Sequence, residues 1–235
     1  MINKNLTANN YIQRNDLDKN LNSKIKKTFT KIFKQICNDI LNNKKIFNIF
    51  EKSFHFNFNK KDLKKFNRFN TIAIIGMGGS ILGAQAMHNF LKKKIKKKVF
   101  FFDNLYEEDI LNLKKNFKSK NVLYIIISKS GNTIETISNL FSLSILKKRN
   151  RNIIIITEKK DNILCILAKK FDLYFIEHKS HIGGRYSVLS EVGIVPVFLM
   201  GLNIEELRKN LKKYLKNKSK EKNYLKESTT ILANI

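Results

Sequence analysis

The chain has 235 residues and a formal net charge of +27, from 46 Lys and Arg residues against 19 Asp and Glu residues. Its hydrophobic fraction of 43% is sufficient for a buried core, but no apolar run approaches the roughly 20 residues of a membrane-spanning helix. Two isolated cysteines, Cys37 and Cys165, argue against a disulfide framework and a metal site and indicate a reducing compartment.

The positive charge is spread along the chain. A nucleic-acid-binding protein concentrates Lys and Arg on one face and interleaves aromatic residues for stacking. Here Lys dominates, Arg is scarce, and Asn, Ile and Phe are also abundant, as A/T-rich codons would produce. The composition therefore predicts no nucleic-acid partner. A positive surface is compatible with an anionic substrate.

Residues 1–69 contain neither Gly nor Pro and are predicted to be helical. In the first half of this region apolar side chains recur at helical spacing, which predicts one buried stripe. Its members are Ile25, Phe29, Ile32, Phe33, Ile36 and Ile40. We expect this region to form a helical extension that packs on the sheet that follows.

The middle of the chain alternates between two kinds of segment. Short runs rich in Ile, Val and Phe are typical of strands buried on both faces. They lie at Thr71–Ile75, Val99–Phe102, Val122–Ile127, Ile153–Ile156 and Leu173–Ile176. Helical stretches are predicted between them, at Ser80–Lys93, Glu107–Phe117, Thr133–Lys148 and Asn162–Phe171. This alternation predicts an α/β fold, a five-stranded parallel sheet with flavodoxin-like strand order, whose ligands bind at the carboxyl edge.

The last part of the chain is predicted to be helical again. Ser187–Leu202 is apolar and is expected to form a buried helix, with Pro196 as a possible kink. An amphipathic helix is predicted to begin near Ile204, on the pattern of Leu207, Leu211, Tyr214 and Leu215. The expected division is a helical region at 1–69, the α/β domain at 70–202 and a helical connector at 203–235.

Three glycines lie within four residues at the end of the first predicted strand. They are Gly76, Gly78 and Gly79, followed by Ser80. Glycines let the backbone turn tightly and approach a ligand, and the following helix begins near Ser80. Free N–H groups and a helix dipole at that point favour an anion. An ordinary strand-to-helix turn would not require three glycines.

A dinucleotide-binding loop is the rival interpretation of this segment. Its Gly-x-Gly-x-x-Gly pattern fails here because Ile81 stands at the last position. Asp103, at the end of the second predicted strand, does resemble the ribose-binding acid of that motif. An NAD-binding site is therefore the weaker alternative.

The third predicted strand ends in a loop rich in hydroxyl groups. Its residues are Ser128, Lys129, Ser130, Gly131, Asn132 and Thr133. Three hydroxyls supply short donors, Lys129 adds a positive field, and Gly131 lets backbone N–H groups converge. Another helix begins near Asn132, so the loop is suited to a phosphate monoester. A capping box with Glu135 would need only one of these hydroxyls.

A third loop, His181–Ser187, places Arg185 directly after two glycines. A guanidinium stays charged and hydrogen-bonds oxygen atoms in a fixed fork, which suits a sugar oxygen or a developing enediolate. A structural role, in which Arg185 pairs with a carboxylate such as Glu191, is the alternative. His178 and His181 flank the loop without a third metal ligand, and His181 is expected to shape the loop.

Together these segments resemble glucose-6-phosphate isomerase. The motifs are Gly78-Gly79-Ser80, the loop at 128–133 followed by Glu135-Thr136, and Gly183-Gly184-Arg185-Tyr186-Ser187 through Gly193. The first two motifs resemble sugar isomerase domains in general, and the third is more specific to the glucose-6-phosphate enzyme. The resemblance covers residues 70–205 with motifs and implies a sugar isomerase domain at 70–202.

The resemblance also implies roles for individual residues. Gly79 and Ser80 would contact the sugar, and Arg185 would stabilise an enediolate during proton transfer between C1 and C2. The phosphate would be surrounded by Ser128, Lys129, Ser130, Gly131, Asn132 and Thr133. The implied reaction interconverts glucose 6-phosphate and fructose 6-phosphate in the cytoplasm, with no cofactor and no metal.

The family's base glutamate, ring-opening histidine and a later lysine lie well beyond the Gly-Gly-Arg loop. We therefore expect that this chain is incomplete, that a second sugar isomerase domain follows residues 203–235, and that residues 1–235 alone do not turn over substrate. The full-length protein is expected to be a homodimer without membrane or nucleic-acid partners. The alternatives are a non-catalytic phosphosugar-binding module, an NAD-dependent oxidoreductase and a nucleic-acid binder.

Overall fold

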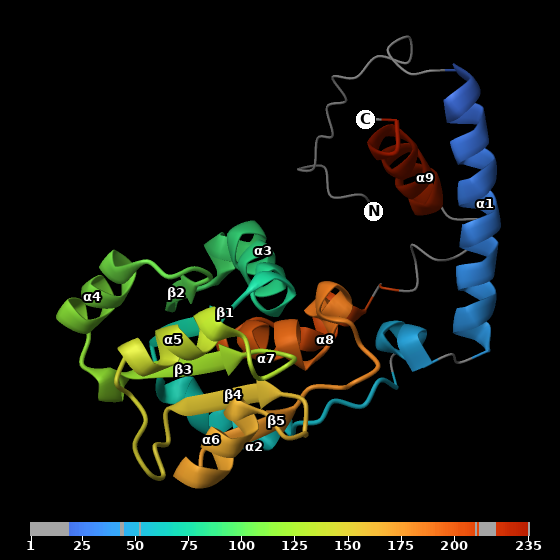
Figure 1. The fold of residues 1–235 in the computed structure, drawn as a ribbon. Helices are drawn as coiled ribbons and strands as arrows, with labels where there is room; N and C mark the ends of the chain where they lie inside the picture. The colour runs from blue at the N-terminus through green and yellow to red at the C-terminus, as the bar shows by residue number, and fades with distance from the viewer. Residues whose placement is uncertain (1–18, 43–44, 52, 210, 212–219, 235) are drawn as a thin grey trace. The chain divides into compact units, whose positions relative to one another are not determined.

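The computed structural model describes residues 19–42, 45–51, 53–209, 211 and 220–234. The chain divides into two compact units. The sheet unit is Lys52–Arg208, and the terminal unit combines Met1–Glu51 with Lys209–Ile235. Figure 1 shows the helices and strands of both units, which are described separately below.

The sheet unit is built around five parallel strands in the order β2-β1-β3-β4-β5. Their bounds are β1 (Thr71–Gly76), β2 (Lys98–Phe102), β3 (Val122–Ile127), β4 (Ile153–Thr157) and β5 (Tyr174–Glu177). This confirms the predicted α/β fold and its flavodoxin-like order. β1, β3 and β4 are buried along their whole lengths, which explains why their sequences are continuously hydrophobic.

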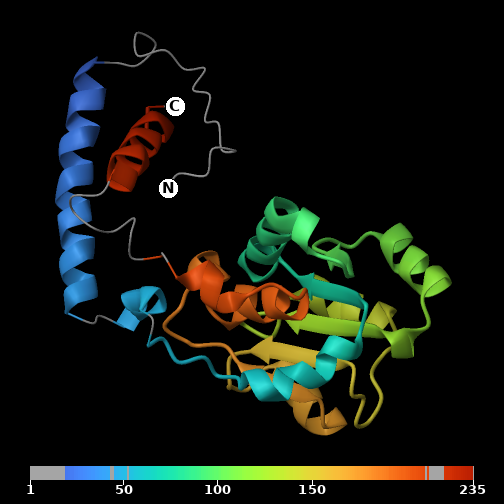
Figure 2. The same ribbon diagram turned by 180° about the vertical axis from the view of Figure 1, so that it is seen from behind.

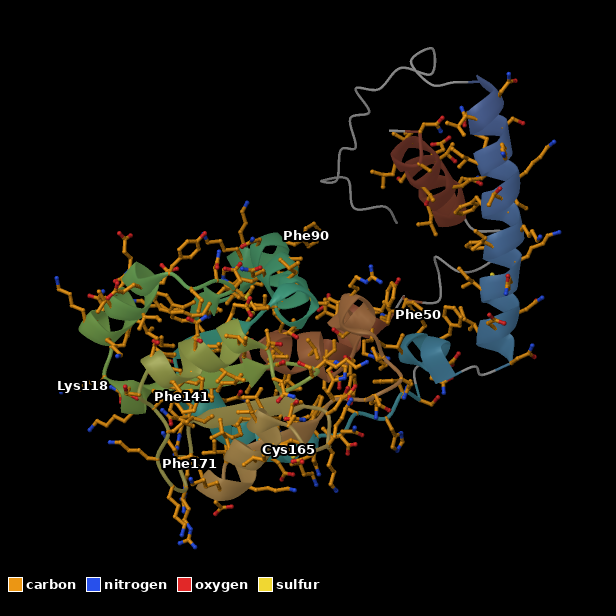
Figure 3. The ribbon with its side chains drawn as sticks, viewed as in Figure 1. Phe50, Phe90, Lys118, Phe141, Cys165 and Phe171 are labelled. Carbon is orange, nitrogen blue, oxygen red and sulfur yellow. The ribbon has the colours of Figure 1, made fainter. Side chains whose placement is uncertain are left out.

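Helices cover both faces of the sheet (Figures 1 and 2). Neighbouring strand residues such as Ile74 and Ile75 point into opposite hydrophobic clusters, as strand geometry requires. One face packs against α2 (Lys60–Lys64), α3 (Leu82–Leu91) and α7 (Glu191–Leu199). The other packs against α4 (Glu107–Asn116), α5 (Ile134–Ser142) and α6 (Ile163–Phe171). Figure 3 shows Phe90 near the end of α3, where its side chain is 74% exposed.

Short 3-10 segments occur in both units; the first one lies in the terminal unit and the others lie in the sheet unit. They are η2 (Lys45–Phe50), η3 (Lys65–Arg68), η4 (Gly78–Ser80), η5 (Lys92–Lys94), η6 (Ser119–Asn121) and η7 (Gly184–Leu189). They account for two differences from the predicted elements. The helix predicted from Ser80 begins at Leu82, because Gly78–Ser80 form η4. The single helix predicted over 187–202 is two elements, because Ser190 is extended between η7 and α7.

The helix predicted at Thr133–Lys148 is also shorter than expected. α5 ends at Ser142, and the chain then takes a left-handed conformation at Ser144 and again at Arg149. Such residues do not continue a right-handed helix. The segment at 143–152 is therefore a connection to β4, although its Leu and Lys residues favour a helix.

The terminal unit contains α1 (Lys19–Leu41), which packs against α9 (Lys220–Leu232). The predicted stripe is real but incomplete. Phe33 is buried, whereas Ile32 is 50% exposed. The expected packing of the N-terminal region on the sheet holds for α2 and η3, whose Leu63 and Phe66 belong to the core of the sheet unit.

The helix predicted near Ile204 is α8 (Ile204–Arg208), in the sheet unit. Its expected continuation through Tyr214 and Leu215 lies outside the described residues. No helix in the described ranges is both long enough and apolar enough to cross a membrane.

Candidate functional site

The candidate site lies at the carboxyl edge of the sheet, where the strand order reverses. β1 and β3 are neighbours, and Gly76 is paired in register with Ile127 at their ends. The chain leaves β1 toward β2 on one side, while β3 and the later strands lie on the other. A crevice at such a switch point is the usual ligand site of open α/β sheets. The loops that follow β1 and β3 both begin there.

The three hydroxyl groups of the second loop lie together. Ser128 Oγ is 2.8 Å from Thr133 Oγ1 and 3.4 Å from Ser130 Oγ, and the Ser130 and Thr133 hydroxyls are 3.4 Å apart. Ser128 Oγ also accepts a hydrogen bond from Gly131 N at 3.1 Å. These contacts bring the predicted hydroxyl donors into one cluster, and each hydroxyl can rotate its proton toward a ligand.

The cluster lies at the start of α5. Thr133 is the N-cap residue of this helix, and its side chain makes no capping bond. The first N–H groups of a helix have no partner within the helix, so these donors and the positive end of the dipole are available to an anion. The alternative prediction is a capping box in which a hydroxyl caps the helix together with Glu135. The structure differs from it, because the Thr133 hydroxyl does not cap α5.

Asn162 supports this loop from the N-cap position of α6, the helix that follows β4. Its side chain caps α6 by accepting a hydrogen bond from Cys165 N at 2.9 Å, and it donates to Glu158 O at 2.9 Å. It also fills the space beside Gly131, where a Cβ atom would meet Asn162 Oδ1 at 1.9 Å. Gly131 has φ +71°, so both its conformation and its neighbour require glycine. Sequence reasoning missed Asn162, although its place after a predicted strand was a usable signal.

The side chain of Asn132 also helps to hold the second loop against α6. Its Oδ1 accepts a hydrogen bond from Ile163 N at 2.9 Å, and Leu164 N donates to Gly131 O at 3.1 Å. The loop is thus joined to the first turn of α6. The predicted role of Asn132 at a phosphate stays a prediction, and its amide oxygen is already used within the protein.

The first loop lies directly against the Arg185 loop. A Cβ atom on Gly79 would meet Gly184 C and O at 2.4 Å and Arg185 N at 2.8 Å. Ser187 Oγ links the same segments, at 3.3 Å from Gly79 O and 2.6 Å from Gly184 O. Ser80 follows Gly79 as the last residue of η4 and is partly exposed. The structure therefore brings together two of the predicted site loops that are more than a hundred residues apart in the chain.

Lys129 joins the second loop to the third. Its Nζ donates to Ser180 O and Ile182 O, both at 2.9 Å, and lies 3.4 Å from Glu158 Oε1. Glu158 is 4% exposed and also pairs with Lys160. The ammonium group of Lys129 thus holds the segment before Arg185, and its predicted place around a phosphate stays a prediction. Sequence reasoning missed Glu158, because nothing local marks it as a partner of Lys129.

Arg185 is exposed at this edge, with its Cζ 5.9 Å from the centroid of the Tyr186 ring. No salt bridge of Arg185 occurs within the described part of the chain. The carboxylate named as its structural partner is used elsewhere. Glu191 Oε1 accepts a hydrogen bond from Asn57 N at 2.8 Å and lies 3.6 Å from Lys179 Nζ. The Arg185 guanidinium is therefore available to a ligand.

His178 is buried behind these loops, at 1% exposure. Its Nδ1 is 2.9 Å from Lys179 O. Burial lowers the pKa of His178, the bond to Lys179 O opposes this effect, and the charge of Lys129 lowers the pKa further. His178 is therefore a buried residue whose surroundings favour the neutral form of its ring. No group of three or more His, Cys, Asp or Glu residues that could hold a metal occurs in the described ranges.

A parallel α/β sheet with phosphate-suited loops at its switch point defines a sugar isomerase type of domain. Comparison with known families narrows this class. The phosphoglucose isomerase family model matches residues 57–225. The chain belongs to the phosphoglucose isomerase family, which confirms the resemblance found in its motifs.

The chain is similar to several curated proteins. It is 34% identical over 149 residues to a probable glucose-6-phosphate isomerase of Methanococcus maripaludis, covering 59% of this chain and 34% of that protein. It is 33% identical over 204 residues to the glucose-6-phosphate isomerase of Borreliella afzelii, covering 80% of this chain and 37% of that protein. The chain thus spans about a third of the length of these curated relatives.

Solved structures show the same architecture. The structure is similar to a glucose-6-phosphate isomerase from Chlamydia trachomatis, with a TM-score of 0.52 and 26% identity, covering 66% of this chain and 31% of that chain. A hypothetical protein from Thermus thermophilus matches with a TM-score of 0.64 and 21% identity, covering 85% of this chain and 52% of that chain. The second likeness concerns the fold alone.

Proposed function

We propose that this chain forms part of an enzyme that interconverts glucose 6-phosphate and fructose 6-phosphate through an enediolate. The observation that supports this proposal most directly is the cluster of Ser128, Ser130 and Thr133 hydroxyls at the start of α5. The contact of Gly79 with Gly184 brings the Arg185 loop to the same edge of the sheet. One edge then offers donors for a phosphate and a cation for a reacting sugar.

Each loop has a proposed part in binding. The hydroxyl cluster and the free N–H groups of α5 hold the phosphate, which is doubly charged near neutral pH and therefore favoured at a helix N-terminus. The backbone around Gly79 and Ser80 contacts the sugar. The Arg185 guanidinium stabilises the negative charge that develops on the oxygens when a proton leaves the carbon between them. Lys129 positions this guanidinium through Ser180 O and Ile182 O.

The base that moves the proton is not assigned to a residue of this chain. Glu135 lies in the first turn of α5, two residues after Thr133. It therefore belongs to the proposed phosphate-binding segment and not to the Arg185 loop. We propose that the base is supplied by the part of the protein that corresponds to the remaining length of its relatives. Residues 1–235 then bind the phosphosugar but do not isomerise it. The expected homodimer of the full-length protein stays a prediction.

Binding and turnover by residues 1–235 test this proposal separately. Fructose 6-phosphate should raise the melting temperature, because a ligand that binds only the folded state stabilises it. The variant Ser128→Ala/Thr133→Val should abolish the shift, and Ser142→Ala, outside the cluster, should retain it. No shift with well-folded wild-type chain would contradict the proposed phosphate site. Robust isomerisation by residues 1–235 would contradict the placement of the base.

A non-catalytic phosphosugar-binding module is the second candidate, because the hydroxyl cluster at the start of α5 offers phosphate donors whether or not a catalytic base is present. The variant Arg185→Ala distinguishes the two. A module that only binds the phosphate should lose little affinity, whereas an enzyme should lose affinity for an enediolate-like hydroxamate analogue far more than for the substrate, because the guanidinium acts on developing charge. NAD, tested in parallel, should produce no shift. A shift with NAD would support the dinucleotide alternative instead.

A further inference from the structure

A second hollow lies at the opposite edge of the sheet, near the starts of β4 and β5. It has a volume of about 590 Å³, within the usual range for small-molecule sites. Three segments distant in the chain line it: η3, the connection before β4 and the turn before β5. The side chains used below are Lys65, Arg68, Arg149, Arg151, Asp172 and Tyr174. Figures 1 and 2 show α2, which runs directly into η3, beside β5.

The walls of this hollow carry four cationic side chains and one carboxylate. Codon bias explains scattered lysines, but it does not explain this set. The whole chain has only six arginines: Arg14, Arg68, Arg149, Arg151, Arg185 and Arg208. Half of them line one hollow, although they come from two separate segments. A concave surface with an excess of positive charge concentrates anionic ligands.

The backbone at Arg149 is a second observation. Arg149 has φ +57°, in the left-handed region. Gly and Asn occupy this region at lower cost than Arg, and the chain has 30 asparagines. Arg149 N donates to Phe171 O at 2.7 Å, which attaches the strained segment to the turn before β5. An arginine in this conformation therefore favours a role for its guanidinium.

The guanidinium groups are largely unused within the protein. Arg149 Nε lies 3.5 Å from Asp172 Oδ2, and both side chains are more than 70% exposed, so this pair is weak. In the described ranges neither Arg68 nor Arg151 donates a side-chain hydrogen bond or forms an ion pair. Arg68 stacks on Phe69, with its Cζ 5.0 Å from the ring centroid. Most of the N–H donors that line the hollow therefore face water.

We propose that this hollow binds a small ligand that carries two or more linked phosphate groups. Guanidinium forks recognise phosphate oxygens in pairs, and the arginines come from two separate segments, so linked phosphates offer a partner to each segment. Lys65 Nζ, which lies 4.3 Å from the Tyr174 ring centroid, adds a further cation to the lining of the hollow. This site is independent of the proposed isomerase function, because it lies at the other edge of the sheet.

A calorimetric titration of residues 1–235 with inorganic tripolyphosphate tests the proposal by measuring the dissociation constant. The variant Arg149→Asn/Arg151→Gln should weaken binding by at least about tenfold, because it removes two charge-assisted contacts. The charge-preserving variant Arg149→Lys/Arg151→Lys should weaken it partly, since Lys lacks the fork. The control Lys92→Gln/Lys93→Gln removes the same charge from an exposed segment that does not line the hollow, and should change little.

Three outcomes would overturn the proposal. Equal losses in the arginine variant and the lysine control would mean that only net charge attracts the anion. Complete loss of tripolyphosphate binding in Ser128→Ala/Thr133→Val would mean that the anion binds only at the carboxyl edge. Amide chemical shifts of the wild-type chain provide a test that does not depend on the folding of variants. Tripolyphosphate should move the amide resonances of Arg68, Arg149 and Asp172, and unchanged resonances there would contradict the site.

Discussion

Gly79 lies so close to Gly184 that a Cβ atom on Gly79 would meet the carbonyl carbon and oxygen of Gly184 at 2.4 Å. The same atom would lie 2.8 Å from Arg185 N. This contact between backbones sets the distance between the first loop and the Arg185 loop. A side chain on Gly79 must therefore displace one of the two segments.

The variant Gly79→Ala should destabilise the chain by about 1–3 kcal/mol, the usual effect of inserting a methyl group into a packed site. It should also weaken binding of fructose 6-phosphate, because the Arg185 loop is displaced. Urea unfolding and a ligand titration measure the two effects. Gly184→Ala is a matched control, since a Cβ atom there has nothing within 4 Å. Equal destabilisation by both variants would show that the contact is not the cause.

The support of the second loop by Asn162 predicts coupling between two positions. Gly131→Ala should destabilise strongly, because its Cβ atom would lie 1.9 Å from Asn162 Oδ1 and the residue has φ +71°. Asn162→Ala alone should cost about 1 kcal/mol through the lost helix cap. In the double variant the clash is gone, so its destabilisation should be smaller than the sum of the two single changes.

The control for this cycle is Gly78→Ala. Gly78 also has a positive φ, of +51°, but a Cβ atom there meets nothing within 4 Å. It should therefore show the cost of the left-handed conformation alone, about 1–2 kcal/mol. Strict additivity of Gly131→Ala and Asn162→Ala in urea unfolding would contradict the predicted contact.

The hydrogen bonds of Lys129 are expected to keep the Arg185 loop ordered. The variant Lys129→Met removes the two hydrogen bonds to Ser180 O and Ile182 O and should cost about 2 kcal/mol. Hydrogen exchange should become faster at residues 180–185, since local opening of that segment becomes easier. Lys160→Met is the matched control, because Lys160 pairs with the same Glu158 carboxylate but is 61% exposed. Faster exchange in the control alone would reverse the assignment.

The lowered pKa of His178 predicts that the free energy of unfolding depends on pH. Its pKa in the folded chain is lowered from the ordinary value of 6.5, so the unfolded chain binds more protons as the pH falls. The stability is therefore fully present above this value and decreases as the pH falls through it. Urea midpoints measured on either side of the unfolded pKa should show this loss.

The variant His178→Gln should reduce the loss, since it removes the titrating group and retains a polar side chain. The exposed His55 provides the control variant, His55→Gln, which should leave the wild-type dependence in place. A pH profile that is the same in wild-type and His178→Gln chains would assign the loss of stability to other groups.

The sequence alone predicted the elements that depend on local pattern. Continuous apolar runs such as Val122–Ile127 become buried strands, and their alternation with helices sets the parallel order. Element ends were less accurate. The segment after Ser142 contains good helix-forming residues, but Ser144 and Arg149 adopt left-handed conformations to reach β4. Tertiary packing overrides intrinsic propensity at such positions.

The sequence by itself determined the fold class, the family and the three loops of the candidate site, because glycine, hydroxyl and arginine residues at the ends of strands carry a local signal. Only the tertiary structure decided which groups those loops contact. Lys129 reaches Ser180 and Ile182, Asn162 fills the space beside Gly131, and Glu191 pairs with Lys179. The tertiary structure also decides that Arg68, Arg149 and Arg151 line one hollow. These contacts join residues far apart in the chain, and the distance between such residues depends on packing rather than on local conformation.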